Sequence, residues 1–181
     1  MSRSAHLPSI VAGFVCLALA VAILVSAGLP ERADYTGFLL SDGTRVAPEI
    51  GAFAPPFTAV LLTGEPITLS EQRGRLVILN FWATWCVPCE VEMPELQRLQ
   101  QARPDVRIFA VNTGESPSIV AAWVMRLQLT LDIVLDSDLR IAQAYQVRGQ
   151  PVTYIIAPDG VIQHILYGAT TQTALERLLA P

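Results

Sequence analysis

A long, almost entirely apolar run lies near the start of the chain. Ile10 to Leu29 contains twenty residues and no charged side chain, which at helical rise covers about 30 Å, the thickness of the hydrocarbon core of a bilayer. Arg3 precedes this run and Pro30-Glu31-Arg32 follows it. The pattern predicts a single transmembrane signal anchor over residues 10–29, with residues 1–9 in the cytoplasm and the rest exported. A cleaved signal peptide is the alternative, because Val25-Ser26-Ala27 is an acceptable cleavage site.

The pattern changes twice after this segment. Residues 30–50 are mixed and rich in turn formers, which predicts a linker between membrane and domain. From Gly51 onward, short apolar runs alternate with amphipathic stretches. The predicted strands are two short runs around Thr63-Gly64-Glu65, then 76–81, 106–111, 132–135, 152–157 and 161–167, and the predicted helices are 87–102, 116–127, 139–145 and 171–179. This order predicts one α/β domain over residues 51–181, with an initial β-hairpin and a mixed central sheet flanked by helices.

Length and charge narrow the possible functions. The 181 residues suffice for one ordinary domain with appendages. The formal net charge is −4, and neither sign forms a long run. The chain therefore lacks the basic patch that nucleic-acid binding requires, and we expect no nucleic-acid partner.

Two of the three cysteines lie in the stretch NFWATWCVPCEVEMPEL, from Asn80 to Leu96. If Cys86 begins a helix and Cys89 lies one turn further on, both sulfurs fall on the same face within disulfide reach. The unpaired N–H groups at the start of the helix lower the pKa of Cys86. Because the thiolate is the form that attacks a disulfide, Cys86 is the expected nucleophile and Cys89 the resolving thiol.

The same cysteine pair could instead form a zinc site or a structural disulfide. A zinc site usually needs four ligands, whereas the domain offers Cys86, Cys89 and His164. A bridge across so short a loop constrains little of the unfolded chain and stabilises weakly. We therefore favour a redox-active pair, and expect no metal and no cofactor.

Several motifs together resemble a known family. They are GAFAPPF (51–57), VILNFWATWCVPC (77–89), EMP (92–94), VRGQPVTYII (147–156) and PDGVI (158–162). In this order they resemble the thioredoxin-like fold over residues 51–181, and within it the membrane-anchored extracytoplasmic thiol–disulfide oxidoreductases of the TlpA and ResA type. A lone CxxC motif would be weak evidence, whereas this set with its spacing is specific.

The resemblance implies roles for individual residues. Cys86 and Cys89 match the redox pair, and Pro151 matches the cis-proline that faces the disulfide and helps to grip the substrate. Gln150, before that proline, and Trp85, before Cys86, are the expected neighbours of the substrate. Gln150 is more polar than the residue expected there, which leaves the substrate preference open.

Glu92 matches an acidic residue that tunes the cysteines in this family. Ordinary thioredoxins carry a buried aspartate at the position that Asn80 occupies here, and an amide cannot move a proton. Glu92 is therefore the expected acid–base group beside the resolving thiol. By its position alone, Glu92 is more simply interpreted as a solvated charge on a helix, and it is the resemblance that favours the functional role.

The expected activity is reduction of protein disulfides outside the cytoplasm. The family's usual substrate is the CxxCH disulfide of apocytochrome c before haem attachment, and the expected electron donor is a membrane thiol carrier of the CcdA or DsbD kind. A peroxiredoxin-like peroxidase is an alternative, because the APPF opening also occurs in such proteins. A non-catalytic, membrane-tethered binding module is another, against which the intact cysteine pair counts.

Overall fold

The computed structural model describes residues 16–19, 37–41 and 43–180. The chain divides into two compact units, Met1–Thr36 and Gly37–Pro181. Residues 16–19 are helical, and the remainder of the anchor predicted over residues 10–29 lies outside the described residues, as does the segment 1–9. Across the residues that the structure describes, no helix is long and apolar enough to cross a membrane.

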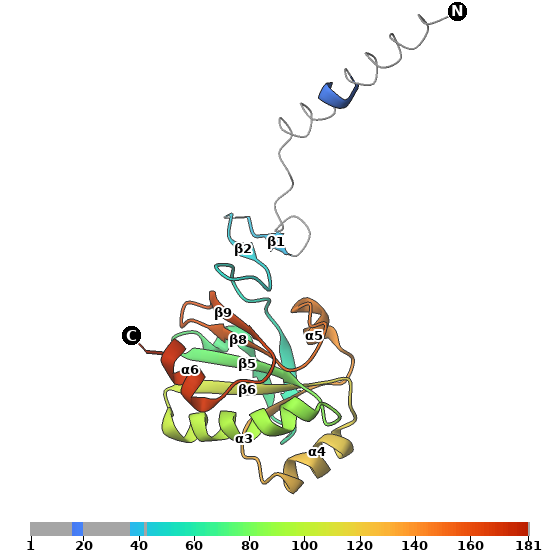
Figure 1. The fold of residues 1–181 in the computed structure, drawn as a ribbon, viewed down its shortest axis with the longest axis vertical. Helices are drawn as coiled ribbons and strands as arrows, with labels where there is room; N and C mark the ends of the chain where they lie inside the picture. Colours follow the sequence, from blue (N-terminus) through green and yellow to red (C-terminus); the bar gives the residue numbers. More distant parts are fainter. Residues whose placement is uncertain (1–15, 20–36, 42, 181) are drawn as a thin grey trace, which may run out of the picture. The chain divides into compact units, whose positions relative to one another are not determined.

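The second unit is built on a seven-stranded sheet with the order β4-β3-β7-β6-β5-β8-β9, drawn in Figure 1. Its strands are β3 (Thr58–Leu61), β4 (Pro66–Thr68), β5 (Leu76–Trp82), β6 (Val106–Thr113), β7 (Asp132–Asp136), β8 (Val152–Ile156) and β9 (Ile162–Tyr167). The helices are the 3-10 helix η1 (Leu69–Gln72), α3 (Val87–Ala102), α4 (Pro117–Arg126), α5 (Arg140–Ala144) and α6 (Gln172–Leu178).

This topology confirms the predicted thioredoxin-like α/β fold. Strands β5, β6 and β7 are parallel, whereas β3 and β8 are antiparallel to their neighbours β7 and β5. The predicted hairpins are present as β3–β4 and β8–β9. The parallel arrangement places the carboxyl ends of β5 and β6 at the same edge of the sheet, from which the segments leading to α3 and α4 depart.

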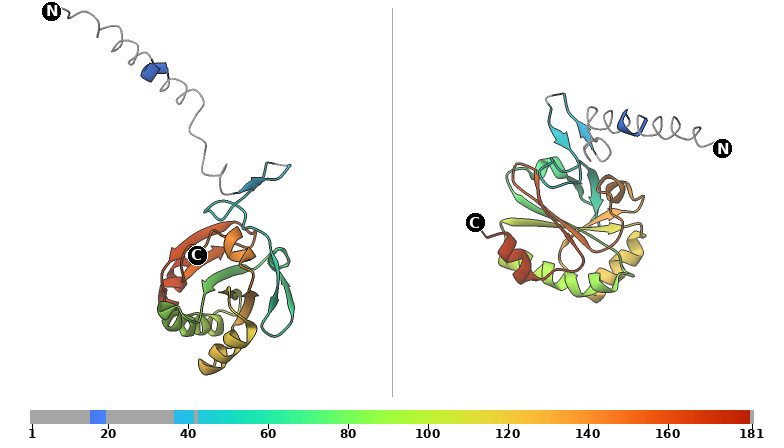
Figure 2. Two further views of the ribbon diagram at one scale, coloured as in Figure 1. Left: turned by 90° about the vertical axis from the view of Figure 1, so that its right-hand side faces the viewer. Right: turned by 45° about the horizontal axis from the view of Figure 1, so that its top comes forward.

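Helices cover both faces of the sheet, as Figure 2 shows. Side chains of β5 alternate between the faces, as the two-residue period of a strand requires. Ile78 and Trp82 belong to the core beneath α3, α4 and α6, whereas Leu79 and Phe81 belong to the core on the opposite face, beside α5. This alternation also directs the side chain of Asn80, which is fully buried, toward the α3 face.

A short hairpin precedes the first strand of the large sheet. Strands β1 (Phe38–Leu39) and β2 (Arg45–Val46) pair in antiparallel register. Gly43 lies in the connecting turn with a φ of 82°, a conformation that favours glycine. Val46 and the following Ala47 are buried, and the N–H of Phe53 donates to the carbonyl of Arg45 at 2.9 Å. The hairpin is therefore joined to the domain by buried contacts.

The linker predicted over residues 30–50 is corrected in its second half. The compact unit begins at Gly37, not at the predicted boundary of Gly51, while residues 30–36 lie outside the described residues. The two paired runs are only two residues long, too short for the periodicity of a strand to be visible in the sequence. Tertiary contacts of Val46 and Ala47, rather than local propensity, hold this segment in place.

Candidate active site

Cys86 and Cys89 form a disulfide at the start of α3. Strand β5 ends at Trp82, and a short loop leads into the helix, which begins at Val87 with Cys86 as its N-cap. The two Cα atoms are 5.2 Å apart, within the usual range for a disulfide. The backbone N–H of Cys89 donates to the sulfur of Cys86 at 3.3 Å. The pair therefore occupies the helix start that its spacing predicts.

The two sulfur-bearing residues differ in their access to solvent. Cys86 retains 4% of its surface, whereas Cys89 retains none. Trp85 precedes Cys86 on the surface and is 68% exposed. A partner thiol or disulfide that approaches from solvent therefore meets Cys86 first.

Glu92 lies one helical turn after Cys89, on the buried face of α3, and is completely inaccessible to solvent. Its Oε2 accepts a hydrogen bond from Asn80 Nδ2 at 2.8 Å, and its Oε1 accepts one from the N–H of Thr170 at 3.0 Å. Burial raises the pKa of Glu92 from 4.5 to about 7, while the two hydrogen bonds act in the opposite direction. A carboxyl group with this pKa can take up and release a proton near neutral pH.

Asn80 connects Glu92 to the strand that follows the cis-proline. Its Nδ2 donates to Glu92 and also to Thr153 Oγ1 of β8, at 2.9 Å. Its Oδ1 is buried and has no hydrogen-bond partner within the described part of the chain. If Glu92 is protonated, a flip of the amide would present this oxygen to the new O–H group. The side chain of Asn80 can thus serve both protonation states of Glu92.

Sequence reasoning did not identify Thr153 or Thr170 as partners of this network. Thr153 lies two residues after Pro151 in a recognised motif, so its place beside the site could have been inferred. Thr170 contributes a backbone N–H group, which leaves no signal in the sequence.

The peptide bond between Gln150 and Pro151 is cis. Strand β8 begins at the next residue, Val152, which pairs with Phe81 near the end of β5. Pro151 therefore lies at the same edge of the sheet as the loop that leads to Cys86. The resemblance predicts that Pro151 and the cysteine pair belong to one site, and the strand register brings the two to the same edge of the sheet.

The side chain of Gln150 is held in a fixed position. Its Nε2 donates to Thr113 Oγ1 at 2.8 Å, and that hydroxyl donates to the carbonyl of Trp82 at 3.2 Å. Gln150, whose effect on substrate preference the sequence left open, is thus connected to Trp82 at the end of β5 through Thr113 at the end of β6.

A second carboxylate fixes the loop before Cys86. Glu115 Oε2 accepts hydrogen bonds from the N–H of Thr84 and from Asn112 Nδ2, both at 2.7 Å, and its Oε1 accepts one from the hydroxyl of Thr84 at 2.5 Å. Sequence reasoning missed Glu115. It follows β6, and the meeting of parallel strand ends at one edge could have indicated its position.

A groove of about 570 Å³ lies beside the disulfide loop. It is lined by Trp85, Thr113, Gly114, Leu139, Ala142, Gln143, Gln146, Val147, Arg148 and Gln150. Trp85 precedes Cys86, and Gln150 precedes Pro151, so the two predicted substrate neighbours lie on one groove. The size and position of this groove suit a segment of a polypeptide.

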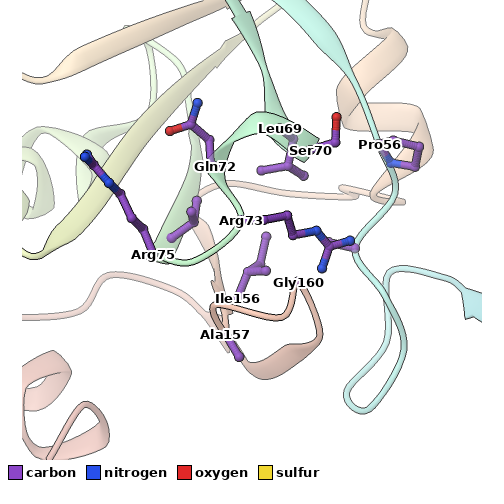
Figure 3. A pocket seen from close by; sticks show the side chains of 11 residues that line it. Pro56, Leu69, Ser70, Gln72, Arg73, Arg75, Ile156, Ala157 and Gly160 are labelled. Atoms are coloured by element: carbon purple, nitrogen blue, oxygen red, sulfur yellow. The ribbon is translucent and has the colours of Figure 1, made fainter.

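A smaller cavity of about 30 Å³ contains none of the predicted site residues. Figure 3 shows Arg73 beside Gly160 at this cavity. Gly160 has a φ of 87°, and a Cβ there would overlap the Arg73 guanidinium. The Arg73 guanidinium also lies over the ring of Phe53 at 5.0 Å. We assign this cavity a packing role, because Arg73 connects three segments of the chain there.

Comparison with known proteins agrees with this geometry. The model of the AhpC/TSA family matches residues 50–165. The thiol–disulfide oxidoreductase ResA of Geobacillus kaustophilus is 40% identical over 147 residues, which cover 80% of this chain and 83% of that protein. ResA of Bacillus subtilis is 35% identical over 127 residues, which cover 69% of this chain and 71% of that protein.

Solved structures show the same similarity. StoA from Bacillus subtilis superposes with a TM-score of 0.63 at 27% identity, and covers 70% of this chain and 97% of its own. A secreted Mycobacterium tuberculosis disulfide oxidoreductase, described as homologous to DsbE of E. coli, gives a TM-score of 0.62 at 27% identity, with 67% and 92% covered. The chain thus belongs to the AhpC/TSA family and is a thiol–disulfide oxidoreductase of the ResA type.

Proposed function

We propose that this oxidoreductase reduces protein disulfides on the extracytoplasmic side of the cell membrane. The observation that carries the direction of electron flow is the buried carboxyl group of Glu92, one turn from Cys89. A strong oxidant of this class is one whose reduced form is stabilised. When ionised, Glu92 disfavours a thiolate beside it, so the reduced pair is less stable and donates its electrons more readily.

The reaction begins with the reduced pair. The thiolate of Cys86 attacks one sulfur of the substrate disulfide, forms a mixed disulfide and releases the other substrate sulfur as a thiolate. Cys86 is the N-cap of α3, and the N–H of Cys89 is directed at its sulfur. This position favours the thiolate form of Cys86.

The second step resolves the mixed disulfide. Glu92 takes the proton from the thiol of Cys89, and the resulting thiolate attacks the sulfur of Cys86. The bond to the substrate breaks, the disulfide between the two cysteines forms, and the released substrate thiolate takes up a proton. Two electrons have then passed to the substrate, and a membrane thiol carrier of the CcdA or DsbD kind must supply the next pair.

We propose the CxxCH disulfide of apocytochrome c as the substrate, on the strength of the similarity to ResA.

Two competing functions have separate tests. Consumption of hydrogen peroxide faster than reduction of a CxxCH peptide would support the peroxidase instead. Full function in cells of a variant with both Cys86 and Cys89 replaced by Ser would support a non-catalytic binding module.

The redox potential of the cysteine pair should lie near that of thioredoxin, about −270 mV. Equilibration of the purified chain with glutathione or dithiothreitol buffers, followed by quantification of alkylated thiols, gives this value. A potential near −120 mV, the value of a strong oxidant, would contradict the proposed direction of electron flow.

We further propose that residues 10–29 anchor the chain in the membrane once, with the catalytic domain outside. The charge-free run of twenty residues supports this. In cell fractionation, the full chain should remain with the membranes, and protease added to spheroplasts should cleave the domain. N-terminal sequencing that finds a mature chain beginning at Gly28 would identify a cleaved signal peptide instead.

A further inference from the structure

The groove beside the disulfide is lined by the residues that directly precede Cys86 and Pro151. Trp85 comes directly before Cys86, and Gln150 comes directly before Pro151. A substrate whose sulfur is bonded to Cys86 therefore has its neighbouring residues close to the mouth of this groove. The lining of the groove can then discriminate between substrates by their sequence near the cysteine.

The lining carries one positive charge and no negative charge. Arg148 is exposed and is the one charged residue among those that line the groove. No ion pair joins Arg148 to a carboxylate of the described residues, unlike Arg126 or Arg140. Its charge is therefore available to a ligand.

Three carboxylates from nearby segments already have partners. Asp136 accepts hydrogen bonds from the N–H groups of Ile141 and Ala142, at 3.0 and 2.8 Å. Glu115 accepts three hydrogen bonds from Thr84 and Asn112, and Asp138 pairs with Arg140, which lowers the pKa of Asp138. None of these three carboxylates lines the groove. Arg148 is therefore the charged side chain that a ligand in the groove contacts directly.

The remaining lining residues suit an extended polypeptide. The side-chain amides of Gln143, Gln146 and Gln150 can bond to peptide groups, and Trp85 offers an exposed aromatic surface. Gln150 is held by Thr113, so part of this wall is rigid before a ligand arrives.

We propose that Arg148 makes this oxidoreductase select protein disulfides with an aspartate or glutamate within a few residues of the attacked cysteine. The proposal rests on the proposed reductase function and deepens it, because it specifies the substrate class. An ion pair between a guanidinium and a carboxylate at a partly exposed site contributes only modestly to the free energy of binding. The expected preference is about three- to fivefold, and salt should weaken it because exposed charges are screened.

The test uses three short peptides with an intramolecular disulfide that differ at one flanking position, which is Glu, Gln or Lys. The pre-reduced full chain in detergent is mixed with each peptide, and the second-order rate constant of reduction is measured at low and high ionic strength. We expect the order Glu, Gln, Lys from fastest to slowest, with the differences reduced at high salt.

The Arg148→Gln variant should reduce the three peptides at nearly equal rates. Arg177→Gln is the matched control, because it removes the same charge from an exposed arginine of α6 outside the groove. The control should keep the preference of the parent chain. Equal rates for the three peptides in the parent chain, or equal loss of preference in both variants, would overturn the role of Arg148. Failure to reduce any of the peptides would instead reject the reductase function on which this role depends.

Discussion

Replacement of Cys89 by Ser should trap the enzyme as a mixed disulfide with its substrate. The first attack needs the thiolate of Cys86, which the substitution leaves in place at the helix start. The second attack needs the sulfur of Cys89, so the complex cannot be resolved. Multiple turnover should fall by at least about a thousandfold, as for the loss of a covalent catalyst. Non-reducing gel electrophoresis of the variant after exposure to a protein disulfide should show the trapped complex.

Cys16 is a free cysteine, so these experiments require a Cys16→Ala background. Cys86→Ser in the same background is the control, because it should form no complex at all. In the reduced parent, iodoacetamide should label Cys86 before Cys89, since Cys86 is the more accessible residue and the helix N-cap. Faster labelling of Cys89, or trapping by Cys86→Ser instead, would reverse the assigned roles.

Replacement of Glu92 by Gln should slow the step that uses Cys89 by about ten- to a hundredfold, the low end of general acid–base effects. The pKa of Glu92 is raised to about 7 by burial. In the parent, the rate of resolution should therefore rise with pH as this carboxyl ionises and becomes able to accept the thiol proton. The variant should lose that inflection. Stopped-flow measurement of the pH dependence of resolution checks this result.

Glu92→Gln should also change how stability depends on pH. Because the pKa of Glu92 is about 7 in the folded chain, against an ordinary value of 4.5, the folded state binds the proton more tightly than the unfolded state. The free energy of unfolding should fall as pH rises from about 4.5 to about 7, by up to about 3 kcal/mol, and remain low above pH 7. Urea unfolding of both proteins from pH 4.5 to 8 isolates this contribution as the difference between the two curves.

The substitution should preserve the fold because the site can accept an amide. The Oε1 of the new side chain can take the N–H of Thr170, and its Nε2 can donate to Asn80 Oδ1, which is buried without a partner among the described residues. This arrangement requires a flip of the Asn80 amide, after which the hydroxyl of Thr153 can donate to Oδ1 where it now accepts from Nδ2. The flipped Nδ2 then takes the unpartnered position, at a cost of about 1 kcal/mol. If parent and variant gave parallel pH–rate and pH–stability curves, the proposed proton transfer by Glu92 would be contradicted.

The sequence was sufficient to predict the arrangement of the main elements. Apolar runs such as 76–81 and amphipathic stretches such as 87–102 recur as β5 and α3, because each carries its own periodicity and turn signals. The cysteine pair was equally visible, since the spacing of Cys86 and Cys89 fixes their place within one turn of a helix. These properties are local, so the sequence determines them without knowledge of distant contacts.

Only the tertiary structure determines the surroundings of the reacting groups and of the residues that contact the substrate. Its position in the sequence alone would favour a solvated helix charge for Glu92. Its burial against Asn80 and Thr170 results from the packing of α3 on β5 and on the segment before α6. The tie between Gln150 and Thr113 joins residues 37 positions apart. The hairpin β1–β2, too short for a periodic signal, is held by contacts with residues that follow it. Protonation and substrate contact depend on the field and the shape that several distant segments create together, and the order of residues along a single segment does not contain that information.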